Sequence, residues 1–298
     1  MRDMEYFAAI AKHGQVQRAA AALGLSQPAL SKSLKRLEQT LKTSLLKRTP
    51  KGVELTSVGK ALLSHIDRMR LTLTDIAREA TDLSEGRTGQ LHVGTGPDLA
   101  LTIVPYACAA LLKDAPMATL RMTAGTADVL LPALSRGEMD LSVNATPLAK
   151  YDDLAHEPVI EEQYLVYCSS NHRLAKKKGV TLADLTGEKW TLADSSASLL
   201  QQDLHQIFAA EGLPAPKVAV ETNSVAFRTL LLPSTDLLGF LPKRAIEKSP
   251  AREQLTQLKI KGLSYQRTIS ICYRKDAYIS PIAQRFIDTL KATARAIL

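Results

Sequence analysis

Residues 15–41, QVQRAAAALGLSQPALSKSLKRLEQTL, predict two helices that are joined by a tight turn. Apolar residues recur at helical spacing as far as Leu23, and Gly24 then breaks the pattern. Ser26 is a typical N-cap, and Pro28 suits the first turn of the helix that follows it. The stretch therefore predicts a helix-turn-helix.

The second helix of this pair is expected to be amphipathic. A helix that lies in the major groove of DNA needs an apolar face toward its own domain and a basic, amide-bearing face toward the bases. An ordinary helical hairpin with a solvated basic face is the alternative. The apolar side consists of Ala29, Leu30, Leu34, Leu37 and Leu41, and the polar side of Gln27, Ser31, Lys32 and Lys35.

Positive charge is concentrated around this motif. Residues 1–60 hold 11 Lys and Arg against 4 Asp and Glu, a net charge of +7, whereas the whole chain of 298 residues carries +8. A basic footprint that is confined to the segment with the motif favours phosphate contacts over general solubility.

A basic wing is expected after the second helix, in residues 44–56, SLLKRTPKGVELT. Pro50 and Gly52 suit the tip of a hairpin between two short β-capable runs. The cations of Arg48 and Lys51 could then reach backbone phosphates beside the helix. A plain basic surface loop is the alternative.

Four stretches, MEYFAAIAKHG, RAAAALGLSQPALSKSLKRLEQTL, LLKR and ELTSVGKAL, together resemble the winged helix-turn-helix of the LysR-type transcriptional regulators. The match runs without a gap through roughly the first sixty residues, and it departs from the family's usual residues at Gln15, Lys42 and Leu46. The resemblance implies that the start of the second helix faces the groove, while Arg48 and the Thr56 region meet the DNA backbone. The candidate DNA-binding residues are Gln17, Arg18, Ser26, Gln27, Pro28, Ser31, Lys32, Lys35, Arg48, Lys51 and Thr56.

A long helix is expected next, at residues 59–87. Apolar residues from Val58 to Leu83 recur in steps of three and four, close to the seam of a coiled coil. We predict that this helix pairs with its symmetry mate, because a dimer presents two recognition helices to two half-sites. The alternative is a helix that packs on its own domain.

Strands and helices alternate through residues 88–298, which predicts parallel sheets with crossover helices. The two halves resemble the lobes of a periplasmic-binding-protein fold, which is also the family's effector domain. The resemblance places residues 88–161 and 267–298 in the first lobe and 162–266 in the second. We expect strands at 90–94, 119–123, 140–144, 165–168, 191–193, 217–220, 237–241 and 268–273, and helices at 99–112, 127–135 and 281–297.

These patterns together predict a multidomain α/β protein. Its parts are a winged helix-turn-helix DNA-binding domain at 1–58, a linker and dimerisation helix at 59–87, and an effector-binding domain at 88–298. The resemblance implies association into a tetramer. It also implies three kinds of partner, namely pseudo-palindromic double-stranded DNA, a small-molecule effector and, as a further candidate, RNA polymerase.

An effector is expected beyond the carboxyl ends of the parallel strands, where helix N-termini supply unpaired amides. Ser, Thr, Asp and Asn at such places are also ordinary helix caps, so each is either a cap or a contact. If Asp98 caps the first helix, an acidic ligand group would address Thr126 or the serines at 195–198 instead. Only the resemblance implies that these segments meet in one cleft. The candidate effector-binding residues are Gly96, Pro97, Asp98, Leu99, Thr126, Asn144, Ser195, Ser196, Ser198, Asn223 and Phe227.

Composition predicts a cytoplasmic protein without a membrane span, because the chain has no long apolar run and its first residues show no signal-peptide pattern. Disulfides, a metal and a cofactor are not expected. Cys108, Cys168 and Cys272 lie far apart in apolar contexts, and the six histidines lack the spacing of metal ligands.

The predicted function is sequence-specific DNA binding that is controlled by a small organic effector, either acidic or aromatic. A solute-binding protein is one alternative, and the basic winged segment argues against it. An α/β enzyme is the other. The sequence offers no catalytic residues, since it has no nucleophile elbow, no phosphate-binding loop and no complete dinucleotide fingerprint.

Overall fold

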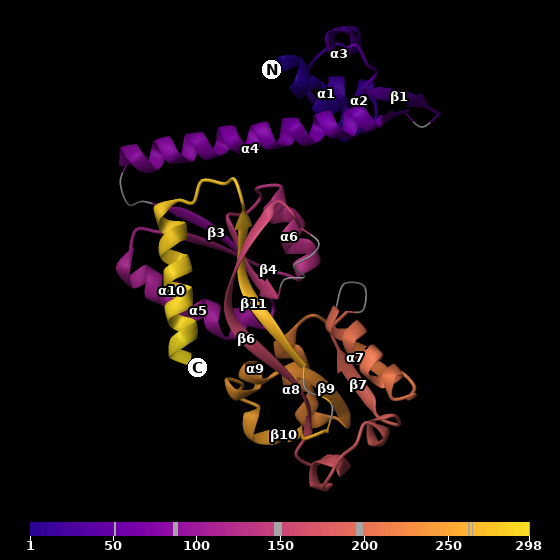
Figure 1. Cartoon of the computed structure of the whole chain (residues 1–298), viewed down its shortest axis with the longest axis vertical. Coiled ribbons are helices and arrows are strands. Elements are labelled where there is room, and N and C mark those ends of the chain that lie inside the picture. The colour runs from indigo at the N-terminus through magenta and orange to yellow at the C-terminus, as the bar shows by residue number, and fades with distance from the viewer. Residues whose placement is uncertain are drawn as a thin grey trace. The chain divides into compact units, whose positions relative to one another are not determined.

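The computed structural model describes residues 1–50, 52–85, 89–145, 151–194, 199–261, 263 and 265–297. The chain forms two compact units, residues 1–78 and residues 79–298, which are both drawn in Figure 1. Each unit has its own hydrophobic core, so each is described by itself.

The N-terminal unit confirms the predicted helix-turn-helix and its wing. The helices of the motif are joined at a turn where Gly24 has a φ of 65°, and the strands of the wing pair antiparallel. A preceding helix and the start of a long helix complete the unit. Its elements are α1 (Arg2–His13), α2 (Val16–Ala22), α3 (Gln27–Leu41), β1 (Leu46–Thr49), β2 (Gly52–Leu55) and α4 (Ser57–Glu85).

The start of α3 follows the expected capping chemistry. The Ser26 hydroxyl accepts a hydrogen bond from the backbone N–H of Ala29 at 3.4 Å, and proline stands in the first turn. The expected apolar side of α3 is correct for Leu30 and Leu37, which are buried, and wrong for Ala29 and Leu41, which are exposed. Those two residues occupy the first and last turns, beyond the reach of the core.

The predicted long helix is present as α4, and its two parts differ. The first part packs on its own unit, because Ile66 is buried and Leu62 and Leu63 join the cluster around Phe7. Farther along, Leu73 and Ile76 are 44% and 55% exposed. The predicted seam therefore divides into a part that packs within the unit and a part that leaves apolar side chains at the surface.

One nine-stranded sheet runs through the C-terminal unit in the order β4-β3-β5-β11-β6-β9-β7-β8, with β10 beside β6. At one end β3 is parallel to β4 and β5, and at the other end β7 is parallel to β8 and β9. The α/β fold class is thereby confirmed. The strands are β3 (Gln90–Thr95), β4 (Thr119–Ala124), β5 (Leu141–Ala145), β6 (Leu154–Ser169), β7 (Lys189–Leu192), β8 (Lys217–Glu221), β9 (Leu237–Pro242), β10 (Leu255–Leu258) and β11 (Tyr265–Arg274).

The prediction of parallel strands is wrong for the middle of the sheet. There β6 and β11 pair antiparallel from Leu154↔Arg274 to Tyr164↔Tyr265, and Figure 1 shows both strands running lengthwise through the two lobes. The first half of β6 lies before the strand expected at 165–168. It mixes apolar residues with His156, Glu157, Pro158 and Glu161, and so lacked the continuous apolar run of a buried strand.

Helices cover the sheet and enclose a core in each lobe. The first core lies between the sheet and two helices and includes Val93, Ile103 and Phe286, whereas Trp190 and Phe208 centre the second. The helices predicted at 127–135 and 281–297 have the expected bounds, while the one expected at 99–112 is split. The elements are η1 (Leu99–Leu101), α5 (Ile103–Asp114), α6 (Ala127–Ser135), α7 (Leu199–Ala210), α8 (Val225–Leu231), α9 (Lys243–Glu247) and α10 (Pro281–Ile297), with short 3-10 turns η2 (Arg173–Lys176), η3 (Ala183–Leu185), η4 (Leu232–Ser234) and η5 (Arg252–Gln254).

A helix that crosses a bilayer must be both long and continuously apolar. Within the described ranges, no helix is both long enough and apolar enough to cross a membrane. Even α4, at 29 residues, interrupts its apolar stripe with charged side chains such as Asp67 and Arg70.

Candidate functional site

The outer side of α3 carries the polar residues that the sequence singled out. Gln27, Ser31, Lys32 and Lys35 are exposed, and so is Pro28 in the first turn. Neither lysine makes an ion pair with any residue that the structure describes. Their ammonium groups are therefore available to an external anion such as a phosphate.

Further cations lie on α2 and on the wing. Gln17 and Arg18 are exposed on α2, and Arg48 is exposed on β1, again without an ion pair in the described part of the chain. The neighbouring Lys47 differs, because its Nζ lies 2.9 Å from Oε2 of Glu54 on β2. Lys51, a candidate at the tip of the wing, lies outside the described residues.

Two candidate hydroxyls are engaged inside the N-terminal unit. Ser26 caps α3, as described above. The Thr56 hydroxyl donates to the C=O of Ser44 at 2.8 Å and accepts a hydrogen bond from the N–H of Gly59 at 3.0 Å, which anchors the start of α4. We therefore interpret Ser26 and Thr56 as residues that stabilise the fold of the N-terminal unit.

A carboxylate that sequence reasoning missed lies behind α3. Asp3 on α1 accepts hydrogen bonds from the Ser33 hydroxyl and from Nε of Arg36, the latter at 2.7 Å. These bonds lower the pKa of Asp3 to about 2, the bond from Arg36 being the largest cause. One of the basic side chains of α3 is thus neutralised from within, while Lys32 and Lys35 are not.

In the C-terminal unit, Asp98 does not have the role that its position suggested. Its side chain makes no capping bond at η1, so the condition that it caps the first helix is not met. Instead, the buried Asp98 carboxylate accepts a hydrogen bond of 2.7 Å from the hydroxyl of Tyr164 on β6. The tyrosine, 66 positions away in the chain, supplies the donor that the helix end would otherwise have supplied.

Several other candidates support the ends of the strands. The N–H of Gly96 donates to the C=O of Val143 at 2.9 Å, and Asn144 is buried with its side-chain amide on the Ser142 hydroxyl. Pro97, next to Gly96, is half-buried. Leu99 is buried in the first-lobe core, so it is not available to a ligand in this arrangement. These positions shape the region around Asp98.

The remaining candidates divide into bonded, open and undescribed residues. Asn223 is bonded, since its Oδ1 accepts the N–H of Asp194 at 3.1 Å. Thr126 begins α6 without a side-chain capping bond and is half-buried, and Phe227 on α8 is 53% exposed. Ser195, Ser196 and Ser198 lie outside the described residues. Thr126 and Phe227 are therefore the candidates whose side chains are open to a partner.

Buried charges near Tyr164 were also missed by sequence reasoning. Glu162 on β6 pairs with Arg244 on α9 at 3.1 Å. Arg228 on α8 is 3% exposed, and one of its terminal nitrogens donates to the C=O of Phe240 at 3.3 Å. Asp98, Tyr164 and Arg228 lie in one electrostatic neighbourhood. Burial raises the pKa of Tyr164 and the Asp98 carboxylate raises it further, whereas burial lowers the pKa of Arg228 and Tyr164 and Asp98 both oppose that lowering.

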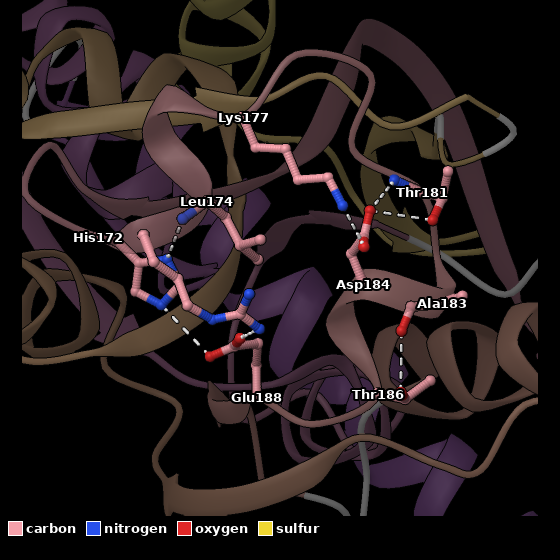
Figure 2. Close-up of polar contacts among 9 residues, drawn as sticks. His172, Leu174, Lys177, Thr181, Ala183, Asp184, Thr186 and Glu188 are labelled. Atoms are coloured by element: carbon pink, nitrogen blue, oxygen red, sulfur yellow. Dashed lines mark hydrogen bonds and ion pairs between the residues drawn. The ribbon is translucent and has the colours of Figure 1, made fainter.

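A second polar cluster, shown in Figure 2, braces the second lobe. Nε2 of the buried His172 lies 3.4 Å from Glu188, and its Nδ1 accepts the N–H of Leu174 at 3.2 Å. Lys177 and Thr181 converge on the carboxylate of Asp184. The contacts drawn there join residues between His172 and Glu188, and the described residues contain no group of His, Cys, Asp or Glu able to hold a metal ion.

Comparison with known proteins separates the same two parts of the chain. Residues 1–60 match the family "Bacterial regulatory helix-turn-helix protein, lysR family", and residues 84–295 match "LysR substrate binding domain". The DNA-binding transcriptional dual regulator OxyR of Escherichia coli is 28% identical over 98% of this chain and 94% of its own length. The HTH-type transcriptional regulator GbpR of Azospirillum brasilense is 26% identical over 99% and 86%.

A solved structure extends the comparison to the fold. Full-length CbnR complexed with its target DNA superimposes with a TM-score of 0.63 at 22% identity, and the match covers 98% of this chain and 99% of that one. The likeness thus includes both units.

Proposed function

Because this chain belongs to the LysR family of DNA-binding transcriptional regulators, we propose that its exposed α3 face reads an operator under the control of an effector held by the C-terminal unit. The observation that carries the proposal is the set of unpaired cations around α3. Arg18, Lys32, Lys35 and Arg48 are all exposed on the same small unit. The DNA-bound CbnR structure, which has the same fold, supports this assignment.

A binding assay with the DNA that flanks the gene for this protein tests the proposal. We expect a salt-sensitive, sequence-specific complex in fluorescence anisotropy. Lys32→Ala is expected to weaken binding about tenfold and to lower the slope of log affinity against log salt by about one. Lys113→Ala on α5 removes the same charge from an exposed site in the other unit, and is expected to leave both quantities unchanged. Equal effects of the two variants would contradict the assigned face.

Self-association is the second part of the proposal. The exposed Leu73 and Ile76 on α4 suit pairing with the same helix of a second copy, which gives two reading heads for a pseudo-palindrome. Further exposed apolar side chains on α5, on β4 and in the loop between them suit a second contact between copies and hence a tetramer. They are Tyr106, Leu112, Met117 and Met122, each of them at least 39% exposed.

Control by a small organic acid or aromatic compound is the third part. We place its site where the lobes meet, near Asp98, Thr126 and Phe227. A thermal-shift screen of small aromatic and aliphatic acids tests this, because a ligand at a hundred times its dissociation constant stabilises the native state by roughly 2.7 kcal/mol. DNA footprints with and without a stabilising compound then test the coupling, and an unchanged footprint would remove it.

A further inference from the structure

Arg228 is a buried cation without a carboxylate partner. Of its five N–H donors, the described part of the structure gives one a partner, the C=O of Phe240, and the buried Nε has none. No Asp or Glu among the described residues forms an ion pair with it. The undescribed stretches 146–150 and 195–198, TPLAK and SSAS, contain no acidic residue.

Such an arrangement is unfavourable for the protein by itself. A charge that leaves water needs a partner and hydrogen bonds to offset the lost hydration. Burial accordingly lowers the pKa of Arg228 to about 10. A neighbouring buried ion, Glu162, has Arg244 at 3.1 Å. The described residues give Arg228 no such partner, and a partner that neutralised its charge would be an anion.

Asp98 does not supply that anion. Its carboxylate lies near enough to favour the charged form of Arg228, yet the hydrogen bond that it makes is to Tyr164 at 2.7 Å. An ionised carboxylate is an acceptor only, with room for several donors. The neighbourhood therefore presents an unpartnered guanidinium together with a carboxylate that can accept more hydrogen bonds.

We propose that Arg228 binds the carboxylate of a small monocarboxylic effector and that Asp98 accepts a hydrogen bond from a hydroxyl or ammonium group of the same molecule. This inference rests on the proposed function, because it assigns the chemical class of the effector. The planar fork of a guanidinium matches a carboxylate with two parallel hydrogen bonds. A second acidic group would meet the negative charge of Asp98, and the repulsion would weaken its binding.

The burial of Arg228 also links binding to lobe arrangement. At 3% exposure, the guanidinium is nearly closed to solvent, so the proposed binding requires the segments around it to separate, and the segment with Asp98 is one of those close enough to act on its charge. A carboxylate that neutralises Arg228 therefore favours one arrangement of the lobes over the other, which is the requirement for a ligand to shift their equilibrium.

Thermal unfolding of the full-length protein with defined probes tests the proposal. Lactate carries one carboxylate and a hydroxyl, lactamide has no charge, and malate adds a second carboxylate. Each probe is used at 100 mM, and the melting temperature is compared with that in sodium chloride at the same ionic strength. We expect lactate to raise the melting temperature by at least 2 °C, malate to raise it by less, and lactamide to leave it unchanged. A rise of equal size with lactamide and lactate would overturn the proposal, as would no rise with lactate.

Three variants connect the effect to named residues. Arg228→Gln is expected to abolish the rise with lactate, and Arg228→Lys to reduce it by at least half, because the charge remains while the fork is lost. Asp98→Asn is expected to raise the affinity for malate at least tenfold relative to lactate. If Arg228→Gln does not fold, the Asp98→Asn variant and the comparison of the three probes on the wild type still test the proposal.

The outcomes also separate this inference from the proposed function. A neutral compound that stabilises wild type and Arg228→Gln equally, and that alters the DNA footprint, would leave the effector-controlled regulator intact and overturn the role of Arg228. If neither carboxylates nor neutral compounds stabilise the protein or alter its footprint, both the inference and the effector control fail.

Discussion

The backbone N–H of Val53 in the wing donates a hydrogen bond of 2.9 Å to the C=O of Gly14, the residue that ends α1. The wing is thereby fastened to the turn that precedes α2. Gly52, beside Val53, has a φ of 138°, and a Cβ there would lie 2.3 Å from the Gly14 oxygen. The position of the wing beside the two helices thus depends on a glycine.

Gly52→Ala is predicted to release the wing. The added methyl group meets backbone, which cannot move aside, and the φ value is strained for any L side chain, so we expect a loss of about 2–3 kcal/mol in unfolding free energy. Chemical denaturation measures it. Gly24→Ala is the control, because Gly24 also has a positive φ but open space around it. Gly24→Ala should lower the unfolding free energy by only about 1 kcal/mol. Equal losses in the two variants would contradict the proposed role of the close contact between Gly52 and Gly14.

Ile76→Glu is predicted to disrupt self-association. A charge in the middle of the exposed apolar stripe of α4 would be buried between two copies, so we expect sedimentation velocity at micromolar concentration to show smaller assemblies than the wild type forms, at most dimers that the second contact holds together. Thr74→Glu adds the same charge on another side of the helix, where the Thr74 hydroxyl bonds only to the C=O of Arg70. That variant should sediment like the wild type. A monomeric wild type would contradict the pairing of α4.

Stability at low pH should report on Asp3. The carboxyl has a folded pKa of about 2 against an ordinary 3.8, so its stabilisation is complete above about pH 4 and is lost as the pH falls toward 2. Asp3→Asn is predicted to cost about 1 kcal/mol at pH 7 and to flatten the change in melting temperature between pH 4 and pH 2. Glu5→Gln, an exposed neighbour on α1, serves as the control. A wild-type slope in Asp3→Asn would show that the contact to Arg36 contributes nothing.

Short-range patterns in the sequence correctly predicted the helices and the hairpin of the N-terminal unit. Ser26 and Pro28 mark the start of α3, and Pro50 with Gly52 marks the hairpin, because capping and turn chemistry act within a few residues. The same patterns did not identify which side chains of α4 are buried. Ile66 and Leu73 stand seven residues apart and so occupy equivalent places in the apolar repeat, and only the fold buries the first and exposes the second.

Long-range partners were beyond reach of those patterns. Asp98 has the sequence position of a helix cap, and its actual partner Tyr164 is on a strand whose first half reads as a charged loop. Arg228 gave no signal, because its burial depends on how α8 packs near β9 and Tyr164. The exposed polar side of α3 was therefore predictable from sequence, while the charges of the proposed effector site required the fold.

The antiparallel pairing of β6 with β11 makes these strands a two-stranded ribbon that connects the lobes and can twist along its length. Both strands belong to both lobes, so sliding one lobe past the other would break their shared backbone hydrogen bonds, whereas twisting preserves them. The register shift between Ile269 and Ser270, opposite Ile160 and Pro158, is where such a ribbon bends most readily. We therefore expect the two lobes to move relative to each other by rotation about that axis.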